Sequence, residues 1–206
     1  MLTFVFCALI CILSAQEKIN LLTKKYKEFS DAAGLPYKTE RMSVAKFHRV
    51  KSLSEKYARY EARASEIFNV IPPVKGDHIQ PQSIFKEMRK SDVGREIFDY
   101  IVENNINVEI NYTTEHDGST RGYCYKGGKY IFVYADVTKT VKQTTKTIIH
   151  EGTHLKYNIG GDQYSEVLCF LQEKKHSKKN LTFSDIKATI KEVKKLYPEL
   201  KWRNNR

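Results

Sequence analysis

The chain lacks a hydrophobic run long enough to cross a bilayer as a helix. Its markedly apolar stretch covers residues 2–13, short of the roughly 20 residues that a spanning helix needs. No internal repeat or low-complexity segment is evident, and there are only 4 cysteines. Cys7 and Cys11 lie in the apolar stretch, so Cys124 and Cys169 are the remaining pair. These two could form a disulfide, although free buried thiols are the commoner outcome.

The beginning of the chain fits two interpretations. Ser14 and Ala15 follow the apolar stretch, so residues 1–15 form a candidate secretory signal peptide, but no lysine or arginine precedes the stretch. The sequence Ser14-Ala-Gln-Glu17 equally predicts a capping box that opens a helix over Gln16–Ser30. The first interpretation predicts secretion and the second does not.

Cationic side chains outnumber anionic ones by 35 to 24, which gives a formal net charge of +11. Many cations lie between Lys38 and Arg63, interleaved with Phe47, Tyr57 and Tyr60. Clustered cations attract nucleic-acid backbones without reading sequence, but the aromatic spacing also predicts an ordinary helix-packing stripe. We therefore expect weak nucleic-acid contact through this basic segment, and keep a nucleic-acid-associated protein as an alternative function.

The 206 residues suffice for one fair-sized domain and an appendage. A boundary is expected at Ile71-Pro-Pro-Val-Lys-Gly76, because two prolines and a glycine are typical of a linker. The expected division is an apolar leader over residues 1–15, a basic helical arm with its linker over 16–76, and a folded domain over 77–206.

The expected domain combines strand and helix patterns. Apolar residues alternate over Ile106–Tyr112, and the turn Lys126-Gly-Gly-Lys129 predicts a hairpin between Arg121–Tyr125 and Tyr130–Tyr134. Helical patterns occur over Ser83–Asn104, Thr140–Tyr157, Tyr164–Leu171 and Phe183–Tyr197. The expected fold class is α+β, with a small mixed sheet packed on the helix Thr140–Tyr157 and a helical arm before it.

The most informative stretch is the pentad His150-Glu-Gly-Thr-His154. Residues four apart share one face of a helix, so the two imidazoles can hold one metal ion while Glu151 reaches a water molecule beside it. Zinc favours imidazole ligands, and a catalytic zinc site uses three protein ligands and an open fourth position. The pentad therefore predicts a zinc hydrolase in which a third ligand must be found.

Three residues after the pentad are candidates for the third ligand. Gly160-Gly161 is expected to end the first helix, and Asp162 is expected to cap a second helix that returns across the metal. Glu166 in the first turn of that helix is the preferred ligand. Asp162 and His176 remain alternatives, although the first suits a helix cap and the second a cation at a helix C-terminus.

The pentad, the Gly160-Gly161 turn and Glu166 together resemble the site of a zincin metallopeptidase with a glutamate as third ligand, a gluzincin-like site. The resemblance covers roughly Gln82–Pro198. It implies a zincin-like fold around an active-site helix, zinc held by His150, His154 and Glu166, and Glu151 as general base. The gap between His154 and Glu166 is much shorter than in the well-known long-linker enzymes.

The same arrangement is similar to metallopeptidase domains of bacterial polymorphic toxins and of phage minor head proteins of the Mu F type. Tyr26-Lys-Glu-Phe-Ser30, Ala33-Gly-Leu-Pro36 and Glu40-Arg41-Met42 carry the head-protein resemblance. These resemblances imply a toxin or phage-associated effector, secreted or virion-associated, with a cytoplasmic location as the alternative. A toxin would have an immunity or inhibitor protein as a partner, whereas a phage structural protein would use the basic arm.

We expect a zinc-dependent endopeptidase whose substrate is a protein or peptide. Peptidases of this shape hold an extended peptide against an open strand beside the metal helix. Tyr157 and Tyr164 flank the expected site, and either hydroxyl could hydrogen-bond the oxyanion that forms when water attacks a peptide carbonyl.

Overall fold

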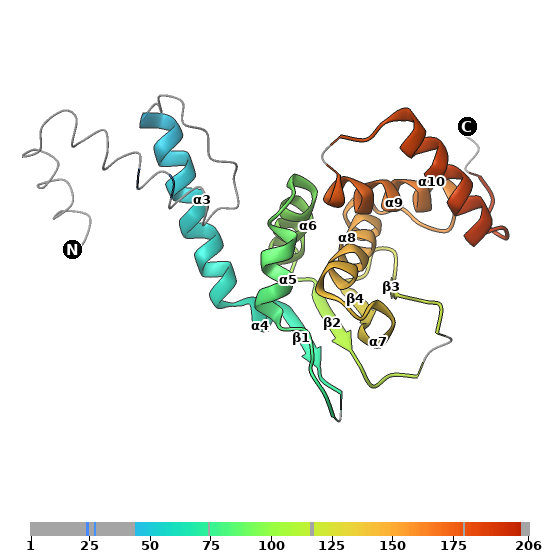
Figure 1. Ribbon diagram of the computed structural model, residues 1–206, viewed down its shortest axis with the longest axis horizontal. Helices are drawn as coiled ribbons and strands as arrows, with labels where there is room; N and C mark the ends of the chain where they lie inside the picture. The colour runs from blue at the N-terminus through green and yellow to red at the C-terminus, as the bar shows by residue number, and fades with distance from the viewer. Residues whose placement is uncertain are drawn as a thin grey trace, which may run out of the picture. The chain divides into compact units, whose positions relative to one another are not determined.

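The computed structural model describes residues 24, 27, 44–73, 75–115, 118–178 and 180–202 (Figure 1). The apolar leader, the residues that carry the head-protein resemblance apart from Lys27, and the helix expected over Gln16–Ser30 apart from Lys24 and Lys27 lie outside the described residues. Within the described ranges, none of the helices combines the length and hydrophobicity that a membrane crossing requires.

The chain divides into two compact units, Met1–Tyr60 and Glu61–Arg206. Apart from Lys24 and Lys27, the described residues of the first unit belong to one helix, α3 (Val44–Ala62), in the segment expected to be a basic helical arm. Within it the Lys56 ammonium lies 5.4 Å from the centre of the Tyr60 ring, and the Tyr57 and Tyr60 rings meet edge to face at 6.2 Å. Tyr57 and Tyr60 therefore pack with each other and with a cation of the same helix.

The second unit is an α+β fold, as the sequence predicts, with a small mixed sheet of four strands in the order β1-β2-β4-β3. Strands β1, β2 and β4 are parallel, and β3 pairs antiparallel with β4 at the edge. The strands are β1 (Phe68–Ile71), β2 (Asn107–Asn111), β3 (Gly122–Cys124) and β4 (Tyr130–Tyr134). The helices are α4 (Ala64–Ile67), α5 (Pro81–Met88), α6 (Asp92–Glu103), α7 (Ala135–Thr138), α8 (Val141–Tyr157), α9 (Gln163–Ser177) and α10 (Phe183–Leu196).

Strand β1 lies before Asp77, in the segment that the sequence predicts to be arm and linker. It pairs in parallel with β2, with Phe68 opposite Val108. Phe68 is fully buried, and its ring lies 5.8 Å from that of Phe98 on α6. The compact unit accordingly begins at Glu61, earlier in the chain than the expected start of the domain. A four-residue strand that directly follows a helical pattern has too short an alternation to be recognised.

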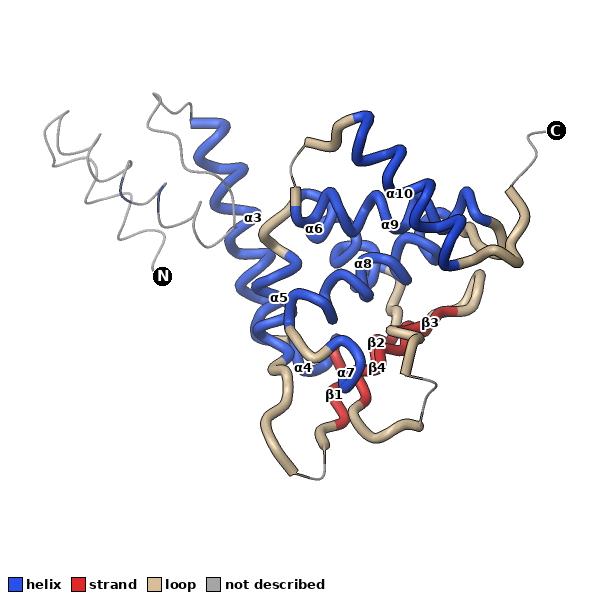
Figure 2. The backbone as a smooth tube through the Cα atoms, turned by 45° about the vertical axis from the view of Figure 1, so that its right-hand side comes forward, coloured by secondary structure: helices blue, strands red, loops and turns tan. Residues whose placement is uncertain are grey.

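Helix α8 is the central element for the site. It contacts α5, α6 and α9 as well as strands β3 and β4 (Figure 2). Ile148 and Ile149 are fully buried on this helix, which accounts for their place beside the pentad. On the α6 side, a Cβ atom at Gly152 would lie only 2.5 Å from Ile97 Cγ2, so glycine permits the two helices to approach closely.

Helix α8 starts and ends where the sequence predicts, but the residue that terminates it is not the expected one. Thr140 is the N-cap, and its hydroxyl accepts a hydrogen bond from the Gln143 N–H. The expected stop at Gly160-Gly161 is wrong, because Asn158 already ends the helix in the left-handed conformation with φ of 49°. Asparagine tolerates this conformation better than most residues. The two glycines instead belong to the turn that leads into α9.

Candidate metal centre

The two histidines of the pentad face α9 from one side of α8. His150 and His154 are only 6% and 8% exposed, and their ring centres are 5.0 Å apart. The carboxylate of Glu166, on the first turn of α9, lies between them. Its Oε2 is 3.2 Å from His150 Nε2 and its Oε1 is 3.3 Å from His154 Nε2. The helix–turn–helix arrangement thus brings all three predicted ligands together.

The other ring nitrogen of each histidine also has a hydrogen-bond partner. His150 Nδ1 lies 2.7 Å from Glu173 Oε1, and His154 Nδ1 lies 3.2 Å from the Ile159 carbonyl oxygen. Because both partners are acceptors, we assign the proton of each neutral ring to Nδ1. With the proton on Nδ1, both Nε2 lone pairs would be available to a metal ion on the Glu166 side, whereas without a metal His150 Nε2 carries a proton and donates to the Glu166 carboxylate.

Glu173 is itself held from the start of strand β3. The Arg121 guanidinium approaches its two carboxylate oxygens at 3.3 and 3.4 Å. The same guanidinium lies 5.7 Å from the centre of the Phe170 ring, which meets the His150 ring edge to face at 5.0 Å. Arg121, Glu173 and Phe170 therefore fix the orientation of His150 from behind, a contribution that the sequence pattern did not predict.

His150 and Glu166 at this centre shift each other's pKa values. Burial alone would lower the pKa of His150, but hydrogen bonds to Glu166 and Glu173 outweigh it and raise the pKa to about 10. Burial likewise opposes ionisation of Glu166, yet the two histidines lower its pKa to about 2. The centre therefore favours an ionised carboxylate beside a cation, and a metal ion could replace the proton on His150.

Cys169 is a further donor at the same place. It follows Glu166 by one helical turn and is fully buried. Its sulfur and one ring nitrogen from each of His150 and His154 all lie within 4.8 Å of one another. Burial, together with the nearby Glu166 carboxylate, raises the pKa of the Cys169 thiol. His150, His154 and Cys169 thus form a buried cluster that could bind a metal ion.

Glu151 and the histidine pair line a cleft of about 1040 Å³. One wall of the cleft comes from β3 and the residues before it, and the other from α9 and α10. Glu151 is buried, and the Cys124 thiol of β3 donates a hydrogen bond to its backbone carbonyl at 3.4 Å. The predicted general base therefore lies between the histidine pair and the edge strand.

Strand β3 lines this cleft and has one open edge, because it lies at the end of the sheet order beside β4. The Tyr134 N–H donates to the Arg121 carbonyl across the β3–β4 pair, and antiparallel pairing alternates along the strand. The backbone groups of Gly122 and Cys124 therefore point to the free edge. A Cβ atom at Gly122 would lie 2.7 Å from Thr147 Cγ2, so only glycine lets β3 lie this close to α8.

The two tyrosines predicted as oxyanion donors do not line the cleft. Tyr157 is 48% exposed, and its hydroxyl lies 3.4 Å from Glu96 of α6. Tyr164 is 41% exposed and packs edge to face on Trp202, with ring centres 6.1 Å apart. Tyr164 precedes Glu166 by two residues, and residues two apart on a helix do not share a face.

Tyr197, directly after α10, lines the cleft instead. Its ring packs on Phe170, with centres 6.4 Å apart. Burial, with the carboxylates of Glu166 and Glu151 adding to it, raises the pKa of Tyr197 to about 12. Its hydroxyl therefore stays protonated and able to donate. In the sequence, Tyr197 is the last apolar residue of the helical pattern Phe183–Tyr197. That position indicates a packing role rather than a role in the site.

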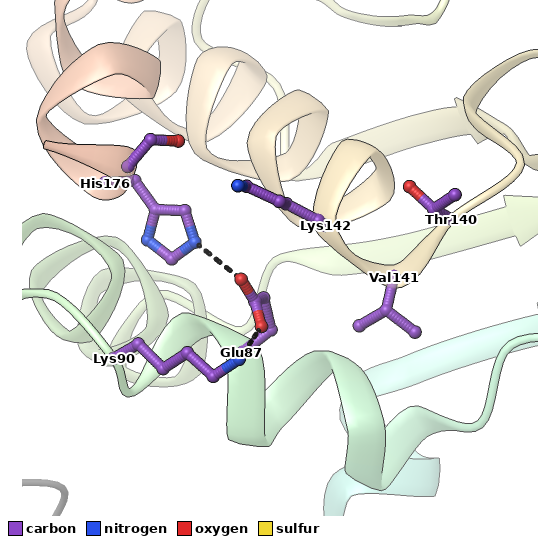
Figure 3. Close-up of a pocket in the computed structure, with 7 residues that line it drawn as sticks. Glu87, Lys90, Thr140, Val141, Lys142 and His176 are labelled. Carbon is purple, nitrogen blue, oxygen red and sulfur yellow. Dashed lines mark hydrogen bonds and ion pairs between the residues drawn. The ribbon is translucent and has the colours of Figure 1, made fainter.

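The two alternative third ligands have structural roles. Asp162 is the N-cap of α9, and its carboxylate accepts a hydrogen bond from the Ser165 N–H at 2.8 Å. His176 lines a second cavity, of about 620 Å³, at the start of α8 (Figure 3). Its Nδ1 lies 2.7 Å from Ser91 Oγ and its Nε2 lies 3.6 Å from Glu87 Oε1. Burial lowers the pKa of His176, although Glu87 opposes the shift.

Comparisons with protein-family models, curated proteins and solved structures found no match to this chain. The proposal for its function therefore rests on the geometry of the site.

Proposed function

We propose that the protein is a zinc-dependent endopeptidase with a zincin-like domain, acting as a toxin or phage-associated effector, in which His150, His154 and Glu166 bind the metal. One observation carries the proposal. Both histidines direct Nε2 to a common carboxylate, while each Nδ1 is held by an acceptor. Histidines that ligate metals characteristically have such a partner on the second nitrogen.

The spacing of the donors also fits zinc. Zinc binds imidazole nitrogen and carboxylate oxygen at about 2.0 Å, so donors at two corners of a tetrahedron lie about 3.3 Å apart. The Glu166 oxygens lie 3.2 and 3.3 Å from the two Nε2 atoms. Two imidazole nitrogens and a carboxylate oxygen are a donor set that zinc uses in catalytic sites.

Glu151 supplies the acid–base chemistry. It follows His150 directly and lies in the cleft, so it can take a proton from an attacking water molecule and pass it to the leaving amine of the substrate. Zinc, when bound, would polarise the scissile carbonyl and acidify that water. The protonated Tyr197 hydroxyl can donate to the oxyanion that develops during attack.

An extended peptide is the substrate that suits the cleft. The backbone groups of Gly122 and Cys124 on the free edge of β3 can pair with such a peptide as an added strand. Cys124 also touches Glu151, so a peptide on this edge would pass beside the general base. The proposed substrate is therefore an unfolded or flexible protein segment.

The alternative function, a phage structural or nucleic-acid-associated protein that uses the basic arm, gains little from α3. Nucleic-acid bases stack on exposed aromatic faces. Tyr57 is buried, and the Tyr60 ring is already covered by Lys56 of the same helix. We propose at most a weak, salt-sensitive nucleic-acid contact for the arm.

Metal content and cleavage of an unfolded protein test the endopeptidase proposal. The full chain should retain stoichiometric zinc and cleave the substrate. Glu151→Gln should keep the zinc and lose about a hundred- to ten-thousand-fold in rate, because only the base is removed. Glu192→Gln changes another carboxylate of the same cleft and should leave the rate unchanged. A zinc-free wild-type protein, or full activity in zinc-loaded Glu151→Gln, would sink the proposal.

A further inference from the structure

A fourth donor stands next to the three proposed ligands. Glu166 and Cys169 are three residues apart on α9, so their side chains leave the same face of the helix. The Cys169 sulfur lies within 4.8 Å of a ring nitrogen of both His150 and His154. Sulfur and nitrogen donors on a tetrahedral zinc lie about 3.5 Å apart, given bonds of about 2.3 and 2.0 Å. A modest contraction around a metal would bring the sulfur into contact.

Packing alone does not account well for this thiol. A free buried cysteine usually behaves as a small apolar side chain among other apolar groups. Cys169 is a free, buried thiol, but it lies among two imidazoles and the Glu166 carboxylate. Thiolate is a strong zinc ligand, and a thiol that binds a metal gives up its proton.

We propose that Cys169 is the fourth protein ligand of the metal held by His150, His154 and Glu166, so that the resting site is closed to water. This inference rests on the proposed zinc endopeptidase. Four protein ligands are typical of zinc sites without an open position, whereas catalysis needs one position free. The wild-type site would then turn over slowly, and loss of the Cys169 thiol would open it.

Cobalt substitution in the full-length protein tests the ligation. Cobalt(II) bound to a thiolate shows a near-ultraviolet charge-transfer absorption that nitrogen and oxygen ligands do not give. We expect this absorption in the wild-type protein, and its loss in Cys169→Ala with cobalt still bound. The combined variant Cys7→Ala, Cys11→Ala and Cys124→Ala leaves Cys169 as the remaining cysteine of the sequence and should keep the absorption.

The outcomes separate this inference from the proposed function. Bound cobalt without thiolate absorption would overturn ligation by Cys169 and leave the endopeptidase intact. Absorption that survives in Cys169→Ala but disappears in the combined variant would also overturn it. A wild-type protein that binds no cobalt would remove both proposals. If Cys169→Ala does not fold, the combined variant still decides, because it leaves Cys169 unchanged.

A separate kinetic measurement tests whether Cys169 occupies the fourth position on the metal. Zinc-loaded Cys169→Ala should have a higher kcat than the wild-type protein toward an unfolded, dye-labelled protein, because water gains the fourth position. Glu192→Gln is the matched control, since it changes a side chain of the same cleft that is not a proposed ligand. An equal or lower kcat in a Cys169→Ala protein that retains its zinc would overturn the closed resting site.

Discussion

Glu173 and His150 are joined by the shortest hydrogen bond of the candidate centre, with 2.7 Å between Oε1 and Nδ1. Helix α9 therefore contributes twice to the site. Its first turn carries the proposed ligand Glu166, and its third turn carries the carboxylate that orients a ligand on α8. Any change that shifts α9 along α8 should disturb both functions together.

The first prediction concerns that hydrogen bond. Glu173→Gln keeps the shape of the side chain but removes the charge that holds the His150 ring and pairs with Arg121. Zinc affinity should fall by about ten- to a hundred-fold, as for other partners of metal-ligating histidines. Competition titration with a chelator measures this, with Glu192→Gln as the control. Unchanged affinity in Glu173→Gln would show that the hydrogen bond does not orient the ligand.

A second pair of variants separates ligand from cap. Glu166→Ala should lose most of the zinc, because it removes the carboxylate between the two Nε2 atoms. Asp162→Ala should keep the zinc and lower the free energy of unfolding by about 1 kcal/mol, because it removes the N-cap of α9. Metal analysis and denaturant unfolding measure the two effects. The reverse pattern would mean that Asp162 is the ligand.

Tyr197 should act on the rate and not on the metal. Removal of one donor to an oxyanion costs about a hundred- to a thousand-fold in kcat, so Tyr197→Phe should lower kcat to this extent with KM and zinc content nearly unchanged. Tyr164→Phe is the matched control, because its ring packs on Trp202 away from the cleft lining. A loss of activity in the control, with none in Tyr197→Phe, would reverse the assignment.

The lowered pKa of His176 should make the stability of the protein depend on pH. Burial holds its pKa below the ordinary value, with Lys146 and Lys90 adding to the effect and Glu87 opposing it. As pH falls through about 6.5, the unfolded chain takes up a proton that the folded ring resists, so stability is lost on acidification. Between about pH 7 and pH 5, the free energy of unfolding of the wild-type protein should therefore fall relative to that of His176→Gln. A difference that does not change with pH would refute this.

The position of β1 leads to a prediction about truncation. A chain from Glu61 to Arg206 should fold cooperatively and bind zinc, because it contains the whole second unit. A chain from Asp77 lacks β1 and the fully buried Phe68, whose side chain alone should be worth about 3–5 kcal/mol. That shorter chain should be unstable or insoluble. Equal thermal unfolding of the two would show that β1 contributes little to the core.

Sequence alone was sufficient where chemistry follows local spacing. Two histidines four residues apart must share a helical face, and a turn capped by Asp162 must return the chain over that face, so the meeting of His150, His154 and Glu166 is predictable. The Lys126-Gly-Gly-Lys129 turn likewise predicts the hairpin between β3 and β4, and the structure confirms this pairing.

Residues that reach the site from distant elements were not predictable. Arg121 and Tyr197 lie 29 residues before His150 and 31 after Glu166 (150 − 121 and 197 − 166), and only tertiary packing brings them to the cleft. Cys169 was missed for a different reason. Its spacing from Glu166 indicates a shared face, but an isolated cysteine on a helix predicts packing more often than ligation.

Gly152 and Thr153, the two positions between Glu151 and His154, have packing roles of their own in this protein. Gly152 provides the clearance for Ile97, and the Thr153 hydroxyl donates to the Ile149 carbonyl at 2.7 Å within the buried interior of α8. Transferring only the histidines and the glutamate to another helix would therefore transfer the donor atoms without these packing contacts. The other helix would need a second helix packed against it as closely as α6 packs at Gly152, so that both imidazoles keep the orientation needed to bind one ion.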